Sequence, residues 1–323
     1  KLLHVCTENT GIFKQHLEWK AHTLHHPLSR YHLYAPLPHP EKKWEFEEAY
    51  KYVIDTYHAF SPRFAIEAHR VRSTSRMDVP IRKGKRGGAY CAQPQKNNAN
   101  YVLLNWTGKM HDVHTLAHEL GHAVHSQLAS SHSIFTFHAP LILAETASTF
   151  GEMLLHERLL SETNDPNVQR YLLAQKIDDA YAAIQRQAFF CQFEIDAYDA
   201  IHAGKSMDDI GTLYFKNLRT QFGNKMDIPA HAQYEWTMVS HLFEHPFYVY
   251  AYSFGELLVL ALFERYQKEG KDFVKDYEHF LSLGGSQHPE KMLVNMGFNP
   301  WKKQSWQKGF HLLEKKMKRL KKM

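Results

Sequence analysis

Residues 118–122 read His118-Glu119-Leu120-Gly121-His122, which is the HExxH pattern of a metal-binding helix. Two histidines four positions apart on a helix project from the same face, one turn above the other. Both imidazoles can then reach a single zinc ion at ~2.0–2.1 Å. Glu119 flanks the metal, where it can accept a proton from metal-bound water. The stretch therefore predicts a catalytic metal site with Glu119 as its general base.

The surrounding sequence supports a helix and offers a third ligand. Apolar residues recur at helical spacing through the motif, namely Val113, Leu116, Leu120, Val124 and Leu128. The longer pattern HExxHxxGxxH is excluded, because His125 and Leu128 stand where it needs glycine and histidine. Glu145 lies 23 residues after His122 (145 − 122), on the next predicted helix. It can complete a His₂Glu site that leaves the fourth position open.

Other residues near the motif have competing interpretations. His114 could ligate together with His118, but we favour His114 and His125 as supporting or partly exposed histidines. Glu145 could instead be a buried glutamate paired with an arginine or a histidine. Its apolar neighbours make a free carboxylate costly, and a metal would remove that cost. Glu152 could hold a ligand histidine through a hydrogen bond, or it could face solvent.

The rest of the chain predicts mainly helix. Residues 1–40 look helical until the prolines at 36, 38 and 40, and residues 41–59 resume helical periodicity. Strand-like runs at 89–91 and 101–104 predict a small sheet or hairpin. Gly84, Gly87, Gly88 and the polar segment Gln95–Asn100 lie before or between these runs. The predicted helices after this element are 110–131, 140–161, 166–204, 206–222, 232–266, 270–282 and 299–322. We therefore expect one mainly α domain over residues 1–323, with a small β element before the motif.

Composition narrows the class of protein. The net charge of +5 is mild for 323 residues and predicts no nucleic-acid partner. Cys6, Cys91 and Cys191 form no paired motif, so we expect reduced thiols and a cytoplasmic protein. The longest apolar run, Leu257–Phe263, is too short for a membrane span, and we expect no membrane partner. The chain opens at Lys1 without methionine or a secretory signal, so we expect a piece of a longer protein.

Several segments carry a family resemblance in a consistent order. They are Arg82–Cys91 (RKGKRGGAYC), Tyr101–Trp106 (YVLLNW), Thr115–Ser126 (TLAHELGHAVHS), Ala144–Glu152 (AETASTFGE), Ala183–Glu194 (AIQRQAFFCQFE) and Tyr248–Gly255 (YVYAYSFG). Together they resemble the oligoendopeptidase F branch of the thimet-oligopeptidase (M3) metallopeptidases, over roughly residues 30–300. The resemblance implies a mainly α, zincin-like metallopeptidase catalytic domain with one zinc ion per chain. It also implies short peptides as substrates.

The resemblance assigns the metal site residue by residue. His118, His122 and Glu145 match the family's zinc ligands, and Glu119 matches its catalytic glutamate. Two imidazoles and one carboxylate suit zinc well, although the sequence does not separate zinc from cobalt or manganese.

Further roles follow from the resemblance alone. A family histidine and family tyrosines stabilise the oxyanion, and His241 and Tyr252 match them, with Tyr248 as a second, substrate-binding tyrosine. Aromatic core packing is the alternative for both tyrosines. The family's glycine loop contacts the substrate backbone, which matches Gly87 and Gly88, since glycine permits close approach. A simple β-turn is the alternative for this pair.

The predicted function is a zinc-dependent endopeptidase that hydrolyses internal bonds of short oligopeptides. Two alternatives stay open, a zinc carboxypeptidase of the same motif type and a catalytically impaired metal-binding fragment. The second arises because we expect the N-terminal lobe usual in this branch to be absent. The basic end Glu314–Met323 could touch an anionic partner, although we favour a solvated helix end, where lysines suit the helix dipole. The oligomeric state is not predictable.

Overall fold

The computed structural model describes residues 1–38, 42–93 and 100–323. Two parts of the sequence predictions lie outside the described residues. They are most of the polar segment Gln95–Asn100, and Pro40, the last of the three prolines near residue 38. The chain forms two compact units. Unit 1 comprises Lys1–His39, Pro166–Leu260 and Trp301–Met323, and unit 2 comprises Pro40–Asp165 and Ala261–Pro300.

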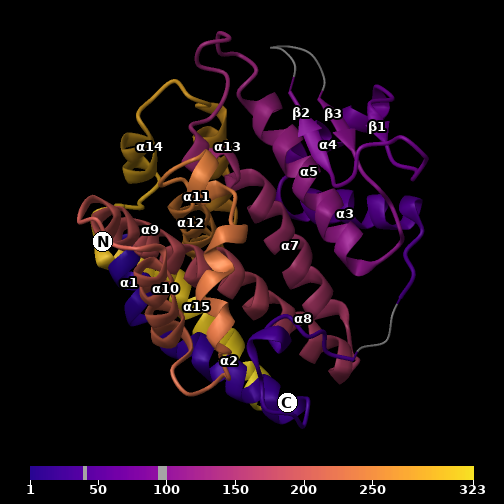
Figure 1. The fold of residues 1–323 in the computed structure, drawn as a ribbon. Coiled ribbons are helices and arrows are strands. Elements are labelled where there is room, and N and C mark those ends of the chain that lie inside the picture. Colours follow the sequence, from indigo (N-terminus) through magenta and orange to yellow (C-terminus); the bar gives the residue numbers. More distant parts are fainter. Residues whose placement is uncertain (39–41, 94–99) are drawn as a thin grey trace. The chain divides into compact units, whose positions relative to one another are not determined.

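Unit 2 contains the HExxH motif and the only sheet of the described residues. Its helices are α3 (Phe46–Phe60), α4 (Pro62–Ser73), α5 (Met110–Leu128), α6 (Leu141–Ala144), α7 (Thr146–Glu162), α13 (Lys271–Ser282) and α14 (Pro289–Asn295). The strands are β1 (Met77–Asp78), β2 (Tyr90–Ala92) and β3 (Tyr101–Leu103). β3 lies in the middle, parallel to β1 and antiparallel to β2, with Cys91 opposite Val102. β2 is therefore an edge strand, and it contacts α5 (Figure 1).

The core of unit 2 is an aromatic cluster around the α5–α7 pair. Phe150 on α7 lies at its centre, with the Tyr277 ring centroid at 4.5 Å and the Phe60 centroid at 5.3 Å. Buried aromatic pairs at such separations add to the hydrophobic contribution of their burial. The cluster therefore fixes α7 against α3 and α13, and with it the start of α7, where Glu145 lies.

Two close approaches hold α5 to its neighbours. A Cβ atom on Gly121 would lie 2.6 Å from the Ala147 carbonyl oxygen, so only glycine lets α5 and α7 pack this tightly. The buried Tyr57 hydroxyl on α3 donates to the carbonyl oxygen of Ala117, the residue before His118. It passes over Gly151, where a Cβ would collide with it. The contacts of α5 with α3 and α7 therefore fix the position of the HExxH motif.

The regular elements of unit 1 among its described residues are helices and helical turns, joined by loops. Its elements are α1 (Leu2–Glu8), α2 (Thr10–Thr23), the short turn η1 (Arg30–His32), α8 (Pro166–Ala180), the π-turn η2 (Tyr181–Gln185), α9 (Arg186–His202), α10 (Met207–Phe222), the 3₁₀ segment η3 (Ala230–Met238), α11 (His241–Glu244) and α15 (Lys303–Lys321). α12 (Tyr250–Glu269) begins in unit 1, and its residues from Ala261 onward belong to unit 2. In α15, Met317 and Leu320 are buried, so the basic end carries an apolar inner face.

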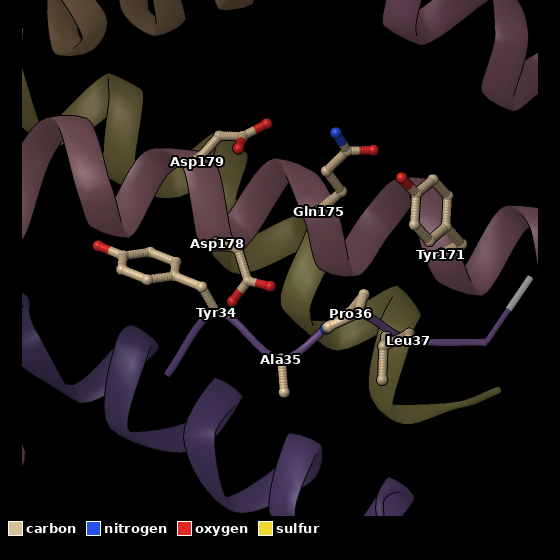
Figure 2. Close-up of a pocket in the computed structure, with 8 residues that line it drawn as sticks. All are labelled: Tyr34, Ala35, Pro36, Leu37, Tyr171, Gln175, Asp178 and Asp179. Carbon is tan, nitrogen blue, oxygen red and sulfur yellow. The ribbon is translucent and has the colours of Figure 1, made fainter. Parts of the chain in front are cut away.

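Unit 1 contains a cavity of about 230 Å³ between the segment Tyr34–Leu37 and α8 (Figure 2). Asp178 on its wall uses both carboxylate oxygens internally. One accepts from Nζ of the fully buried Lys20 at 2.8 Å, and the other from Nε2 of His16 at 2.8 Å. A buried ammonium group needs such a partner, so the role of Asp178 is to compensate the charge of Lys20 inside unit 1.

The mainly α fold with a small sheet is confirmed, as are the strands near 90 and 101. Two helix predictions are wrong. The range 232–266 is not one helix, because the chain leaves helical geometry between η3 and α12 around Pro246 and Phe247, whose φ is +58°. The range 140–161 is interrupted at Glu145, with φ −87° and ψ 1°. Helix α4 was not predicted, although Ser61 caps it and Pro62 occupies its first turn.

Candidate metal centre

His118, His122 and Glu145 converge in unit 2. The Nε2 atoms of the two histidines lie 3.1 Å apart, and each lies 3.2 Å from Oε2 of Glu145. Among the described residues this is the one group of three potential ligands whose donor atoms meet within 4.8 Å. The helix repeat of α5 brings the two imidazoles together, and the α5–α7 contact brings the carboxylate.

The size of this triangle fits a tetrahedral zinc ion. Bonds of ~2.0–2.1 Å at tetrahedral angles place donor atoms roughly 3.3 Å apart. All three observed separations are close to that value. Two imidazole nitrogens and one carboxylate oxygen are also a donor set that zinc accepts, with a fourth position left for water.

Glu152 supports the first histidine from behind. Its Oε1 atom lies 2.5 Å from Nδ1 of His118. The carboxylate can only accept, so Nδ1 donates and Nε2 is left to face Glu145 and His122. Glu152 lies on α7, seven residues after Glu145, which precedes the helix directly, so one short segment supplies both a candidate ligand and the partner of another. Of the two interpretations open from sequence, the contact agrees with the supporting role.

Glu119 is buried beside the ligands. Its side chain is 5% exposed, and Oε2 has no hydrogen-bond partner among the described residues. Burial raises the pKa of this carboxyl, while the nearby charges of His118 and His122 act in the opposite direction. An unengaged carboxylate oxygen with a raised pKa suits a group that must take up a proton.

Two of the candidate ligands, His118 and Glu145, have shifted pKa values in the metal-free protein. Burial lowers the pKa of His118, but hydrogen bonds to Glu145 and Glu152 outweigh it and raise the pKa to about 10. For Glu145, burial raises the pKa, but hydrogen bonds from His118 and His122 hold it far below its usual range. The three side chains thus attract one another before metal binds, which preorganises the site.

Three further side chains near the motif do not join the ligand group. His114 directs Nδ1 to the carbonyl oxygen of Met110 at 3.1 Å. His125 is buried, and burial lowers its pKa to about 4, so it is a neutral ring at physiological pH. Cys91 on β2 is a free thiol, and burial together with the charge of Glu119 raises its pKa. A thiol of this kind is a poor metal ligand at neutral pH.

The sequence model of Peptidase family M3 matches residues 41–312. The chain belongs to peptidase family M3. It is 31% identical over 271 residues to Oligopeptidase PepF of Bacillus subtilis (strain 168), which covers 83% of this chain and 40% of that protein. It is 28% identical over 296 residues to the chromosomal Oligoendopeptidase F of Lactococcus lactis subsp. cremoris, covering 91% of this chain and 49% of the relative. The chain thus spans about half the length of these relatives.

Solved structures agree with this membership in family M3. A protein of Chlamydophila abortus, described as a candidate peptidase, superimposes with a TM-score of 0.89 at 28% identity over 99% of this chain and 54% of that one. Oligoendopeptidase-F from Enterococcus faecium superimposes with a TM-score of 0.71 at 20% identity, over 99% of this chain and 51% of that one. The second likeness concerns the fold.

The residues suggested for the oxyanion form a cluster within unit 1 of this M3 chain. The Tyr252 hydroxyl lies 3.2 Å from Nε2 of His241, and the Tyr248 ring stacks on His241 with centroids 5.7 Å apart. Tyr252 is 37% exposed, so its hydroxyl is not confined to a core. The sequence alternative of aromatic core packing therefore describes Tyr252 poorly.

Gly87 and Gly88 lie in the loop before β2. Gly88 has φ +77°, and its carbonyl oxygen accepts from the Asn105 side chain at 2.8 Å. A Cβ on either glycine would meet nothing within 4 Å, so the requirement at Gly88 is conformational and the space beside both is open. A turn and a surface open to a peptide are both compatible with this arrangement.

Glu194 was not predicted as a site residue from the sequence, but in the structure it contacts Phe247, the residue before Tyr248. Its Oε1 accepts from the backbone N–H of Phe247 at 2.7 Å, and its buried Oε2 has no partner among the described residues. Phe247 has φ +58°, an unfavourable conformation for a bulky residue. The signal was present in the sequence as the end of the segment Ala183–Glu194, but no spacing rule connects it to Phe247.

Proposed function

We propose that this chain is the catalytic part of a zinc-dependent endopeptidase acting on short oligopeptides. The observation that carries the proposal is the triangle of His118, His122 and Glu145 with the unengaged carboxylate of Glu119 beside it. A structural zinc site would more often close its fourth position and would need no base. Membership in family M3 and the names of the relatives point in the same direction.

The residues divide the chemistry between them. When bound, zinc would supply Lewis acidity for the attacking water and the scissile carbonyl. Glu119 accepts the proton of that water and then delivers it to the leaving amine. Glu152 keeps His118 in the tautomer whose Nε2 faces the metal. The burial of Glu119 assists this proton transfer, because it raises the pKa of the carboxyl group and so favours uptake of the proton.

The edge strand β2 offers a place for the substrate backbone. β2 pairs with β3 on one side, and its other side pairs with no strand of the described residues. An extended peptide can add to such an edge through main-chain hydrogen bonds. We propose that Gly87 and Gly88, just before β2, let the peptide approach the backbone closely.

The remaining proposals concern stabilisation of the oxyanion and the cellular location of the protein. We propose that His241 and Tyr252 donate hydrogen bonds to the oxyanion and that Tyr248 contacts the substrate. The three cysteines are free thiols, which supports a cytoplasmic location. No helix of the described residues has the length and apolar character needed to cross a membrane.

The test is cleavage of a peptide of about ten residues, internally quenched and blocked at both ends. We expect internal cleavage that a chelator abolishes and added zinc restores, and cleavage by Glu119→Gln that is slower by about 10²-fold or more. Release of single residues from an unblocked peptide alone would indicate a carboxypeptidase instead. Bound zinc without cleavage would indicate a metal-binding fragment that lacks catalytic competence.

A further inference from the structure

A cavity of about 80 Å³ lies against the metal ligand His122, within unit 2. Four parts of the chain line it. They are the face of α5 that carries His122 and His125, Gln93 directly after β2, the loop Phe137–Ala139, and Ala144 at the end of α6. Because His122 is also a candidate metal ligand, a group in the cavity would lie beside one of the residues proposed to hold the metal.

The size of the cavity limits what can enter. An apolar cavity of about 150 Å³ accommodates benzene, with its six heavy atoms. By proportion, about 80 Å³ accommodates roughly three heavy atoms. Alanine, serine, threonine and valine have side chains of this size, whereas aromatic and long side chains do not.

The lining also selects against charge. None of the described residues that line the cavity has a carboxylate, ammonium or guanidinium group. Two of the polar groups are engaged elsewhere, since Gln93 donates to the His122 carbonyl oxygen at 3.2 Å and Ser126 donates to Asn100 at 2.8 Å. The remaining polar residues of the lining are His122, His125 and His138. A lysine or aspartate side chain would be desolvated there without a partner.

One wall of the cavity is held rigidly. The loop that contains Phe137 and His138 rests on the turn after α13, where the Gly285 N–H donates to the Thr136 carbonyl oxygen at 2.8 Å. A Cβ on Gly285 would lie 2.4 Å from the His138 carbonyl oxygen. A wall fixed by backbone contacts can discriminate between side chains that differ by one or two carbons.

We propose that this cavity receives a short, uncharged side chain of a substrate residue next to the scissile bond, and that Phe137 and Ala139 set the size limit. The inference rests on the proposed peptidase function and specifies its substrate class. Peptides with alanine, serine, threonine or valine at that position are the preferred substrates. Peptides with an aromatic or charged residue there are disfavoured.

The experiment compares blocked, quenched peptides that vary at each residue flanking one cleavage site, with the cut located by mass spectrometry. At one position we expect kcat/KM for valine to exceed that for phenylalanine or lysine at least tenfold. Ala139→Leu fills the cavity and lowers kcat/KM for valine about tenfold relative to glycine. Phe137→Ala enlarges it and raises kcat/KM for leucine relative to valine. Ala203→Leu, the same change at an exposed position, leaves the ranking unchanged.

A second measurement does not depend on turnover. Zinc-loaded Glu119→Gln protein is titrated with the same peptides by calorimetry, and the order of Kd values should follow the same preference and shift with Ala139→Leu. Thermal unfolding confirms that each variant is folded. If peptides are cleaved or bound but neither Ala139→Leu nor Phe137→Ala alters the ranking, the cavity is not the subsite and the peptidase function stands. If no peptide is cleaved or bound, both proposals fail.

Discussion

Oε1 of Glu152 lies 2.5 Å from Nδ1 of His118, while Nε2 of the same ring faces His122 and Glu145. This contact determines which nitrogen of His118 is available to a metal. Partners of this type typically change metal affinity 10–100-fold when they are removed.

Glu152→Ala should therefore weaken zinc binding about 10–100-fold while the protein stays folded. Competition with a chromophoric chelator measures the affinity. Glu152→Gln keeps an acceptor oxygen and should lose less. Glu162→Ala, on the exposed end of the same helix, is the control and should bind zinc normally. Unchanged affinity in Glu152→Ala would show that the contact does not orient the ligand.

Glu119→Gln should lower kcat by about 10²–10⁴-fold, because the amide cannot accept the proton of the attacking water. Zinc content by atomic absorption should stay at one ion per chain, since Glu119 is not part of the ligand triangle. Near-normal turnover would exclude Glu119 as the base. Loss of zinc would instead assign it to the ligand set.

Zinc binding should release protons. In the metal-free protein the pKa of His118 is raised to about 10 by Glu145 and Glu152 against the effect of burial. At pH 7.5 this imidazole is protonated, and zinc needs it neutral, so affinity should rise with pH toward pH 10. Calorimetry in two buffers of different ionisation enthalpy should show roughly one proton released from this group. Equal enthalpies in both buffers would contradict the assignment.

The same raised pKa predicts the pH dependence of folding without metal. A histidine with a raised folded pKa contributes stability that is fully present below its unfolded pKa of about 6.5. That contribution is lost as the pH rises toward about 10. Urea unfolding of metal-free protein at pH 6 and pH 10 should show the loss for the native sequence. The loss should be smaller for Glu152→Ala.

Gly121→Ala should destabilise the protein by about 1–3 kcal/mol, because the new Cβ would lie 2.6 Å from the Ala147 carbonyl oxygen and force α5 from α7. Zinc affinity should fall with it, since Glu145 precedes α7. Gly255→Ala is the matched control. It lies inside α12 with nothing within 4 Å of a new Cβ, and should be neutral or stabilising by up to about 1 kcal/mol. Denaturant unfolding distinguishes the two.

Local patterns predicted the parts of the site that a single helix determines. Four-residue spacing is enough to place His118 and His122 on one face of α5, and the structure shows them there. The position of Glu145 was predicted as part of a continuous helix, yet it lies at the break between α6 and α7. That break depends on the packing of α7, which no local pattern contains.

Contacts between segments far apart in the chain could not be predicted from the sequence. The hydrogen bond between Glu194 and Phe247 joins residues 53 apart in sequence. Phe247 has a left-handed backbone conformation, which a sequence pattern indicates only where glycine occupies the position. The long helix predicted over 232–266 failed at this point, although Pro246 gave a local warning. Helix α4 was missed for another reason, because the helical prediction stopped at residue 59 and the start signals Ser61 and Pro62 directly after α3 were not used.

The hydroxyl of Tyr57 has a consequence for protein engineering. It connects α3 to the turn just before His118, sixty residues away in sequence, and the bare Cα of Gly151 makes room for it. The candidate metal centre is therefore not a property of one helix that could be moved alone into another scaffold. A graft would have to carry α3, α5 and α7 together, with Tyr57, Gly121 and Gly151 as the joints that keep their spacing.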